Sequence, residues 1–578
     1  MNSDLEKIKR RRGEWEEKVL KPALKRFSLE EPPTKFYTPA DIGDFDFLEK
    51  VGFPGEYPFT AHIFPTEVRG GGGEEGEGLR RAVRYYSGYG MAEDTRDFYK
   101  QMQSLGRRGG PNIAFHLPTQ CGYDSDHPIA QGEVGKAGVA VDTLRDFECI
   151  YEAFTGPYDL DKIASNWTIN APAIIIIAMY IALAEQRGIP QEKLRATPQN
   201  DILKEFVARG TYLFSPKHSM RLFRDIVIYC TKHMPRMNTC SICAEHMREA
   251  GAKGVMDLAF GLCNAIAYIQ TGIEAGLDVD EFAPRFTYRG FGGGSLNIFF
   301  ALARVRASRR VFAKIMKERF KAKNPRSWIL RGGEQGWFVK DTMTTNRYLN
   351  NLTRGVINGV IAALGGGEVE YSITPYDEPL GLGHSLEAQQ LSIDAARIIE
   401  EEAGLCDVSD PLAGSYYLEY LTDQMEKEIW EIINKVDSLG GAIAAIERGF
   451  YQEEIAKGAY KFFKGIETGE RKIVGLNCYT GEHELEVTTS YLVPHPYDPR
   501  KREEAEAKQI AKLQQVKKER DNQHVQATLK RLKEAAKDEK VNLLPPALEA
   551  VKAYASVGEI CDVFRGVFGE YQPWSLRI

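Results

Sequence analysis

The strongest constraint on the fold is a regular alternation, between residue 51 and about residue 420, of short strand-like segments with longer amphipathic ones. Amphipathic stretches such as 201–209 and 248–271 predict helices between the strands. Repeated strand–helix units are typical of a parallel sheet, and at this length a (β/α)8 TIM barrel is the economical closure. The predicted strands are residues 113–117, 163–170, 195–199, 238–243, 284–288, 328–331 and 368–374.

The segments that flank this alternating region differ from it in pattern. Residues 1–50 read as a charged helix followed by an extended arm with three prolines, which suits contact with another subunit. Residues 421–578 are helical, and the charged stretch 499–540 within them reads as a solvated face. We therefore predict an α/β protein with three domains: the arm (1–50), the barrel (51–420) and a helical C-terminal region (421–578).

Several predicted strands carry small polar residues where a barrel interior normally has Val, Ile or Leu. A lumen threaded by a long polar ligand would favour such residues. The alternative is that these segments are loops rather than strands. The residues are Ser165, Asn166, Thr168, Thr197, Gln199, Asn238, Thr239, Ser241, Ser372 and Thr374.

Composition excludes several classes of function. With 75 Lys and Arg against 81 Asp and Glu the net charge is −6, which argues against binding to nucleic acid or to a membrane surface. The apolar run 171–184 is shorter than the roughly 20 residues that span a bilayer, so we expect a buried helix there. The N-terminus lacks the apolar core of a secretory signal. Nine scattered cysteines favour a reducing cytoplasm over a disulfide framework.

No short motif identifies the function by itself. Cys240 and Cys243 form a lone C-x2-C, which favours two buried cysteines over a zinc site because no second ligand pair is evident. His246 follows a polar strand at the end where barrels place their chemistry, and a His there, considered alone, is somewhat more often structural than catalytic. Arg209 lies at the far end of an amphipathic helix, where a surface ion pair is the ordinary interpretation.

Longer ordered blocks are more specific. Together they resemble the large subunit of the adenosylcobalamin-dependent acyl-CoA mutases, the methylmalonyl-CoA mutase superfamily, from about Asp44 to the C-terminal helices. The blocks are FPGEYPFT (53–60), RYYSGYG (84–90), LPTQCGYDSDHP (117–128), GEVGKAGVAVD (132–142), TPQNDILKEFVARGTY (197–212), EHMREAGA (245–252), GLDVDEFAPR (276–285) and DPLAGSYYLE (410–419).

The resemblance implies an isomerase that catalyses a radical 1,2-rearrangement, in which the carbonyl-CoA group migrates to the adjacent carbon. Coenzyme A would thread the polar lumen, and adenosylcobalamin would supply the radical. Catalytic residues would be Tyr86 and His246, the latter on the thioester carbonyl. Arg209 would bind a substrate carboxylate. Other substrate contacts would be Arg84, Thr168, Thr197, Gln199, Asn238, Arg285 and Thr287; cofactor contacts would be Gly88, Gln120, Ala137, Glu249, Trp337 and Glu378.

The same resemblance predicts partners. The family's Asp-x-His-x-x-Gly cobalamin motif does not occur in this sequence. We therefore expect adenosylcobalamin to be held mainly by a separate small cobalamin-binding subunit, which the N-terminal arm would grip. A homodimer of large subunits within a heterotetramer follows from the family, and a G-protein chaperone is a further partner that it admits.

Departures from the family pattern cluster around the acyl pocket. His116 replaces an Asp, Glu245 replaces a Tyr before the catalytic His, and Arg289 is additional. Residues 62–83 replace a segment that clamps the acyl group. We expect all three residues to contact substrate, and a close His116–Glu245 pair would favour an imidazolium.

Retention of Arg209 favours a carboxylated acyl-CoA of the methylmalonyl or succinyl type, and the departures favour a substituted one. The alternatives are a branched or hydroxylated monocarboxylic acyl-CoA and a non-catalytic acyl-CoA-binding paralogue.

Overall fold

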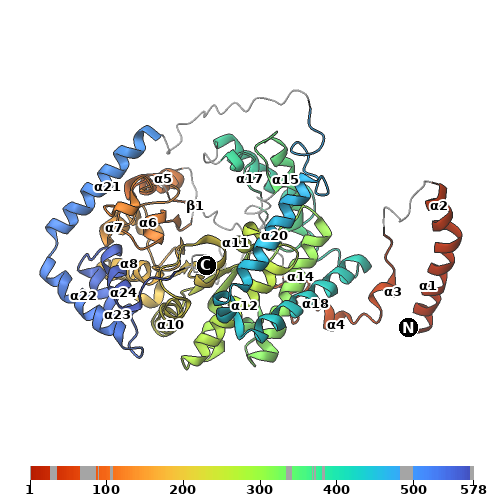
Figure 1. The fold of residues 1–578 in the computed structure, drawn as a ribbon, viewed down its shortest axis with the longest axis horizontal. Coiled ribbons are helices and arrows are strands. Elements are labelled where there is room, and N and C mark those ends of the chain that lie inside the picture. Colours follow the sequence, from red (N-terminus) through yellow and green to blue (C-terminus); the bar gives the residue numbers. More distant parts are fainter. Residues whose placement is uncertain are drawn as a thin grey trace.

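The computed structural model describes residues 2–26, 35–65, 86–88, 90–104, 109–332, 342–367, 369, 373–380, 385–481 and 499–572. Two parallel sheets lie at the centre of the molecule (Figure 1): one has the order β1-β2-β3-β4 and the other pairs β5 with β6. The strands are β1 (Tyr86–Ser87), β2 (Asn112–Ala114), β3 (Ser165–Thr168), β4 (Ala196–Pro198), β5 (Cys240–Cys243) and β6 (Phe286–Arg289).

Backbone hydrogen bonds join the two sheets into one series. The Ser241 N–H of β5 donates to the Gln199 carbonyl beyond β4 (2.8 Å), and the Tyr288 N–H of β6 donates to the Arg331 carbonyl (2.9 Å). The strands therefore follow one another in chain order, as in a barrel wall. The described residues do not close the ring, and residues 370–372 of the last predicted strand lie outside them.

Helices alternate with the strands, which confirms the predicted strand–helix units. Residues 173–184 of α8 are all buried, because α8 packs between the strand layer and α23. This confirms the buried apolar helix that the sequence predicts at 171–184. The helices of this region are α5 (Ala92–Ser104), α6 (Leu117–Gln120), α7 (Leu144–Tyr151), α8 (Ala173–Gln186), α9 (Ile202–Lys204), α10 (Pro216–His233), α11 (Glu245–Ala250), α12 (Met256–Glu274), α13 (Val279–Phe282), α14 (Ile298–Lys314), α15 (Asn350–Leu364) and α17 (Leu386–Glu401).

The C-terminal helices pack on the strand–helix region at two places (Figure 1). Helix α18 lies against α12 and α14, and α23 lies against α8 and α10. They are α18 (Tyr416–Ser438), α19 (Gly441–Glu447), α20 (Phe450–Glu467), α21 (Pro499–Glu519), α22 (Asn522–Lys537), α23 (Leu544–Lys552) and α24 (Val557–Phe568). The division into three domains stays a prediction.

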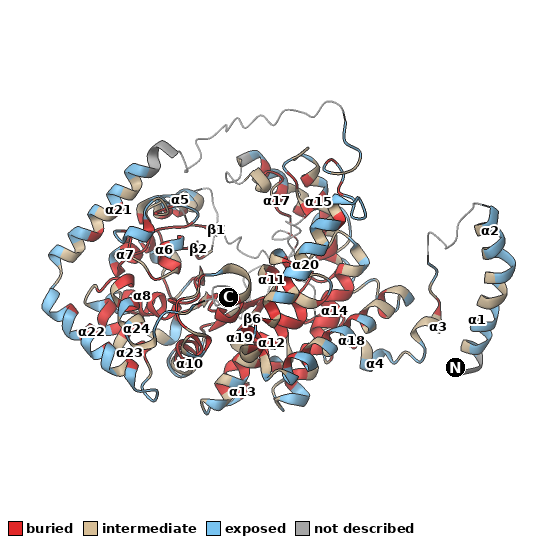
Figure 2. Ribbon diagram, in the orientation of Figure 1, coloured by how far each residue is buried: buried red, intermediate tan, exposed pale blue. Residues whose placement is uncertain are grey.

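Buried arginines of α14 hold α18 in place. Arg306 forms ion pairs with Asp410 and Glu419, and Arg310 pairs with Asp423 (2.7 Å) and Glu426 (2.8 Å). A guanidinium is tolerated in a protein interior when carboxylates and carbonyls satisfy its fork of donors. Figure 2 shows buried residues gathered around the strands and along α14.

The N-terminal arm extends from this body (Figure 1). Helices α1 (Asn2–Trp15) and α2 (Lys21–Arg26) stand apart, and α3 (Pro39–Ile42) and α4 (Phe47–Lys50) follow. Arg12 of α1 bonds Asp41 (2.8 Å), and Tyr37 packs on Tyr417 and Tyr420 of α18. The arm is thus anchored through its second half.

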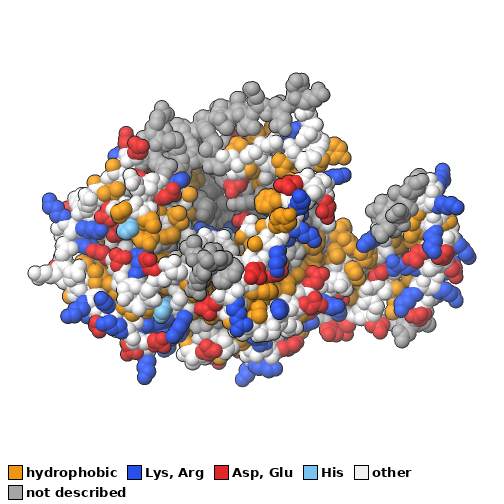
Figure 3. Space-filling model, in the orientation of Figure 1, with side chains coloured by type: hydrophobic (Ala, Val, Ile, Leu, Met, Phe, Trp, Pro, Cys, Tyr) orange, Lys and Arg blue, Asp and Glu red, His pale blue; other side chains and the backbone are white. Residues whose placement is uncertain are grey.

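The visible surface carries both signs of charge interspersed over the arm and the C-terminal helices (Figure 3), as a small net charge predicts. None of the described helices has the length and apolar character needed to cross a membrane.

Candidate active site

The predicted site residues gather at the carboxyl ends of β4, β5 and β6. Gln199 follows β4, Glu245 and His246 begin α11 after β5, and Arg289 ends β6. Parallel α/β sheets place their functional groups at this edge, because the loops that leave it are free to vary.

The strands themselves alternate between two environments. Their fully buried positions, such as Trp167 and Phe286, face the helices, whereas the polar positions stay partly accessible on the other side. A lumen filled by its own side chains would leave the second set inaccessible. The accessible set is Asn166, Thr168, Thr197, Ser241, Thr287 and Arg289.

Neighbouring strands bring polar side chains together along this side. Register pairs Asn166 with Thr197 and Ser241 with Thr287. Asn238 donates to the Thr197 hydroxyl (2.8 Å) and accepts from the Arg331 guanidinium (2.6 Å). These contacts leave an accessible polar wall. Of the polar residues, Ser165, Asn166, Thr168, Thr197 and Ser241 lie in strands, whereas Gln199, Asn238, Thr239 and Thr374 lie outside the described strands and Ser372 lies outside the described residues.

A cluster of Cys243, Glu245 and His246 follows β5, with their polar side-chain atoms within 4.8 Å of one another. The Glu245 carboxylate is 5% exposed, and its Oε1 lies 3.0 Å from Nε of Arg289. Cys240 and Cys243 are both fully buried, as expected, and burial raises the pKa of both thiols. Inert thiols of this kind are structural rather than nucleophilic.

His116 has a different environment from the expected one. Its Nδ1 accepts a hydrogen bond from the Gly135 N–H (3.1 Å), and burial lowers its pKa to about 3. The imidazole is therefore neutral at pH 7 and carries its proton on Nε2. The expectation of an imidazolium held by Glu245 is wrong, because Glu245 pairs with Arg289 and His116 is desolvated without a compensating charge.

Arg209 ends the helical turn that follows α9. Its Nη2 donates to Oε1 of Gln120 (3.1 Å), and its Nη1 lies 3.6 Å from Oε1 of Glu205. Within the described part of the chain, the buried Nη1 has no hydrogen-bond acceptor. Gln120 in turn donates to the Phe115 carbonyl (2.6 Å), so a residue predicted to contact the cofactor orients Arg209 here.

Glu205 is the buried centre of a polar network. It forms an ion pair with Lys204 and accepts hydrogen bonds from Asn170 (2.7 Å) and the Thr211 hydroxyl (2.6 Å). Burial alone would raise the pKa of Glu205, but the charges of Lys204 and Arg209 outweigh it and lower the pKa. The carboxylate therefore stays ionised.

Asn170 connects this network to the cluster after β5. It also donates to Oε1 of Gln199 (2.9 Å), whose Nε2 donates to the Cys243 sulfur (3.4 Å). A continuous chain of polar contacts thus runs from Arg209 to the neighbourhood of Glu245 and His246. Lys204, Glu205 and Asn170 are not among the site residues predicted from the sequence; the adjacent Lys-Glu pair in an otherwise apolar turn is the signal that points to two of them.

The remaining predicted residues do not all lie at this edge, since Arg285 is at the amino end of β6. Gly88 has φ 124° and lies against the Ala114 backbone, so a side chain there would clash. Ala137 and Glu249 are exposed, Glu378 begins a short helical turn, and Arg285 precedes β6. Thr287 donates to the Cys240 carbonyl (3.2 Å). Arg84, Trp337 and the Tyr86 side chain lie outside the described residues; the Tyr86 backbone begins β1.

Comparison with known proteins places the chain among the coenzyme A mutases. It is 40% identical over 541 residues to the 2-hydroxyisobutanoyl-CoA mutase large subunit of Aquincola tertiaricarbonis, which covers 94% of this chain and 91% of that one. It is 38% identical over 537 residues to the methylmalonyl-CoA mutase of Escherichia coli strain K12, covering 93% and 71%. The mitochondrial methylmalonyl-CoA mutase of Homo sapiens is 36% identical over 522 residues, covering 90% and 66%.

A family model described as methylmalonyl-CoA mutase matches residues 29–570. The chain belongs to the methylmalonyl-CoA mutase family, whose members use cobalamin and acyl-CoA substrates. The prediction that it is an acyl-CoA mutase, and hence an isomerase, is confirmed at the level of the family.

Proposed function

We propose that this chain is the large subunit of an adenosylcobalamin-dependent mutase that moves the carbonyl-CoA group of a carboxylated acyl-CoA to the adjacent carbon. The buried Nη1 of Arg209, which has no acceptor among the described residues, carries this proposal. A substrate carboxylate would complete the guanidinium's hydrogen bonds in the bidentate geometry that Arg favours.

The remaining residues keep the roles that the family resemblance implies for them. Coenzyme A would thread the lumen beside Thr168, Thr197, Asn238 and Thr287, with Arg84 and Arg285 as its basic contacts. Gln199 and His246 would hold the thioester carbonyl, because the chain of contacts from Arg209 ends beside them. Tyr86 would lie between substrate and cofactor. We propose that the strands close as a (β/α)8 barrel around this ligand.

The cofactor face is compatible with a flat macrocycle. Gly88 and Gly138 allow close backbone packing at the carboxyl edge of the strands, and Ala137 remains exposed beside them. Residues that would hold the group are Gly88, Ala137, Glu249, Trp337 and Glu378. When bound, adenosylcobalamin supplies the radical, and the protein orients the substrate and excludes water. Gln120, from its contact, is better assigned to positioning Arg209.

We further propose a separate small cobalamin-binding subunit as the partner. The absence of an Asp-x-His-x-x-Gly motif from the sequence supports it, and so does the name "large subunit" of the Aquincola relative. The N-terminal arm would grip that subunit, because α1 stands apart and exposes Trp15 and Val19. A heterotetramer with two large subunits and assistance from a G-protein chaperone belong to the same proposal. Nine unpaired cysteines support a reducing, cytoplasmic setting.

A second candidate substrate is a hydroxylated or branched monocarboxylic acyl-CoA, which the 2-hydroxyisobutanoyl-CoA mutase relative favours. The two candidates differ in whether the substrate offers a carboxylate to Arg209. A non-catalytic acyl-CoA-binding protein remains the third outcome of the test below.

The test mixes the purified chain with small cobalamin-binding subunits and adenosylcobalamin, and follows the visible spectrum as acyl-CoA esters are added. We expect a spectral change that requires both subunits and a carboxylated ester. A response only to neutral esters would move the proposal to the second candidate. Tight ester binding with no spectral change across the panel would favour the non-catalytic protein, and Tyr86→Phe would then bind and behave as the parent does.

A further inference from the structure

The carboxylate of Glu245 is incompletely satisfied in a buried position. Its Oε1 forms an ion pair with Nε of Arg289 at 3.0 Å, whereas its Oε2 has no hydrogen-bond partner in the described part of the chain. Glycine at 290 permits this arrangement: φ is +72°, and a Cβ there would lie 2.6 Å from Cβ of Glu245. The end of β6 is thus held directly against the start of α11.

A buried carboxylate oxygen without a donor destabilises the folded protein by itself. A protein retains such a group where a ligand supplies the missing donor, as recognition sites for substrate hydroxyl groups do. Glu245 stands where the family pattern has a tyrosine before the catalytic histidine, so this acceptor is a departure from that pattern.

Arg289 provides the complementary half of the site. Its side chain is 37% exposed, and its Nε lies 3.0 Å from Oε1 of Glu245, so a cationic donor group borders the unsatisfied carboxylate oxygen. The pair therefore offers an acceptor and a donor side by side. A hydroxyl group matches both, since it donates one hydrogen bond and accepts another. An ammonium group would match Glu245 but would be repelled by Arg289.

The position of the pair indicates which part of the substrate it contacts. Glu245 lies within 4.8 Å of the His246 ring and the Cys243 sulfur, close to the place assigned to the thioester. Among the described residues, contacts through Gln199, Asn170 and Glu205 connect this cluster to Arg209. A ligand that uses both ends has its carboxylate at Arg209 and its hydroxyl near the thioester.

We propose that Glu245 and Arg289 form a binding site for a hydroxyl group on carbon 2 or 3 of the acyl chain, so that the preferred substrate is a hydroxylated carboxyacyl-CoA. This inference rests on the proposed function, because it assumes that the acyl group lies beside His246.

The test measures equilibrium dissociation constants of the full chain by calorimetry, with no turnover required. The probes are butanoyl-CoA and succinyl-CoA, each unsubstituted and with a hydroxyl on carbon 2 or carbon 3. For at least one position we expect the hydroxyl to lower Kd about 10- to 100-fold in both series, as a hydrogen bond to a charged group does. The preference for succinyl over butanoyl esters reports on Arg209 independently.

Variants separate the two halves of the site. Glu245→Gln preserves the size of the side chain and removes its charge. In this variant we expect the Kd values of hydroxylated and unsubstituted esters to agree within about threefold, while the preference for succinyl over butanoyl esters is kept. Arg209→Gln should show the reverse. Glu281→Gln, an exposed glutamate on α13, is the matched control and should behave as the parent. Thermal melts check that each variant is folded.

The outcomes are distinguishable. Binding of succinyl-CoA with no hydroxyl preference would overturn this inference and leave the proposed function intact. A hydroxyl preference that survives Glu245→Gln would overturn the assignment to Glu245. Failure of every ester to bind would overturn the proposed function itself.

Discussion

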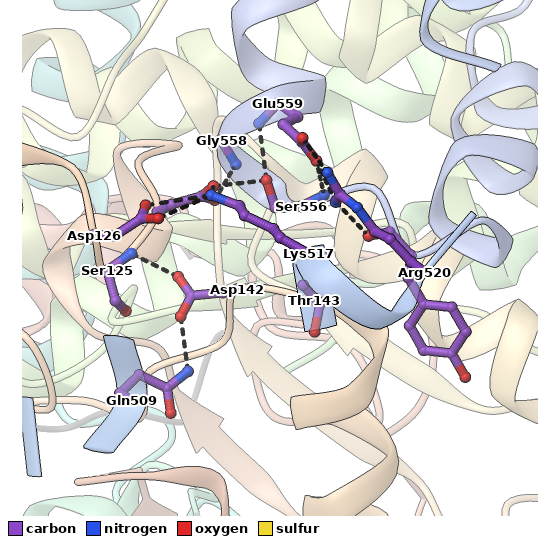
Figure 4. Close-up of polar contacts among 12 residues, drawn as sticks. Ser125, Asp126, Asp142, Thr143, Gln509, Lys517, Arg520, Ser556, Gly558 and Glu559 are labelled. Atoms are coloured by element: carbon purple, nitrogen blue, oxygen red, sulfur yellow. Dashed lines mark hydrogen bonds and ion pairs between the residues drawn. The ribbon is translucent and has the colours of Figure 1, made fainter. Parts of the chain in front are cut away.

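Two buried clusters of charged and polar residues in this protein have similar composition but differ in how fully the chain itself satisfies the hydrogen bonds of their carboxylates. One is the site at the ends of β4, β5 and β6. The other, which we name the C-terminal clamp, joins α21 and α24 to the segment between α6 and α7 (Figure 4). The clamp consists of Asp124, Ser125, Asp142, Gln509, Lys517, Ser556 and Gly558.

In the clamp, the chain itself satisfies every carboxylate oxygen. Oδ2 of Asp124 accepts from the Ser556 hydroxyl (2.6 Å) and Lys517 (3.0 Å), and its Oδ1 accepts from the Gly558 N–H (2.7 Å). Oδ1 of Asp142 accepts from the Ser125 N–H, and its Oδ2 contacts the Gln509 amide (2.7 Å). These contacts connect positions more than 360 residues apart in the sequence.

This difference distinguishes a cluster that stabilises the fold from a cluster that binds a ligand. A cluster whose carboxylates are all satisfied internally stabilises the fold and leaves no charged acceptor for a ligand. In the clamp, the buried atoms that lack a hydrogen-bond partner among the described residues are neutral ones, Oγ of Ser125 and Oε1 of Gln509. Glu245 and Arg209, by contrast, each keep a buried atom of a charged group without a hydrogen-bond partner there. We therefore expect substitutions in the clamp to change stability and substitutions in the site to change ligand affinity.

The largest expected effect is that of Asp124→Ala in the clamp. It leaves the half-buried Lys517 without its main partner and two further donors unsatisfied, so we expect a loss of about 3–5 kcal/mol in the free energy of unfolding. Urea denaturation measures this loss. Asp126→Ala is the matched control, because the exposed Asp126 also contacts Lys517, and it should cost less than about 1 kcal/mol. Equal losses in the two variants would contradict the clamp.

Arg209→Gln should change affinity rather than stability. We expect Kd for succinyl-CoA to rise about 10- to 100-fold, because the bidentate charged contact is lost, while Kd for butanoyl-CoA changes less than about threefold. Calorimetric titration gives both constants. A parallel rise for the two esters would show that Arg209 supports the pocket without contacting the carboxylate.

The clamp should also weaken as the pH rises. Burial, together with the charges of Asp124 and Asp146, raises the pKa of Asp142 to about 8, against 3.8 for an ordinary aspartate. The folded protein thus keeps a proton that the unfolded chain releases, and stability falls between these two values as pH increases. With the Gln509 side-chain amide turned over, its Oε1 accepts a hydrogen bond from the protonated Asp142 carboxyl.

Asp142→Asn mimics the protonated form and removes this dependence. Between pH 6 and 7, we expect the stability of the variant relative to the parent to increase by roughly 1 kcal/mol. Urea unfolding at both pH values measures the change. A constant difference between variant and parent would show that Asp142 is ionised in the folded protein.

The smallest effect is expected at His116, with the opposite sign. Burial lowers its pKa to about 3, so the unfolded chain binds a proton that the folded protein refuses, and stability falls as pH drops below about 6.5. Between pH 7 and 6 the parent should lose less than about 1 kcal/mol in the free energy of unfolding because of His116, and His116→Asn should not show this loss. Kd for the acyl-CoA esters should not change with pH in this range. If Kd changes with pH in the parent but not in His116→Asn, His116 is an imidazolium that takes part in binding.

Sequence patterns predicted much of the scaffold. Strands β2 to β6 overlap predicted ones, and α8 lies where the apolar run indicated, because period and composition depend on local burial. Strand β1 was missed, since a two-residue strand has no period to detect. The charged stretch 499–540 is predicted to be a solvated face, but Gln509 and Lys517 project from it into the clamp and Lys512 bonds Glu93 of α5. Hydropathy cannot distinguish a charge in water from one paired in the interior.

By itself, the sequence determined the family, the strand–helix alternation and the residue types at the acyl pocket, because these depend on local pattern and on matching blocks. Only the tertiary structure decided which charges meet. It paired Glu245 with Arg289 rather than with His116, and it placed Gln120 on Arg209. Such pairings depend on how separate loops converge at one edge of the strands, and electrostatic energy falls off over a few ångströms that sequence spacing does not specify.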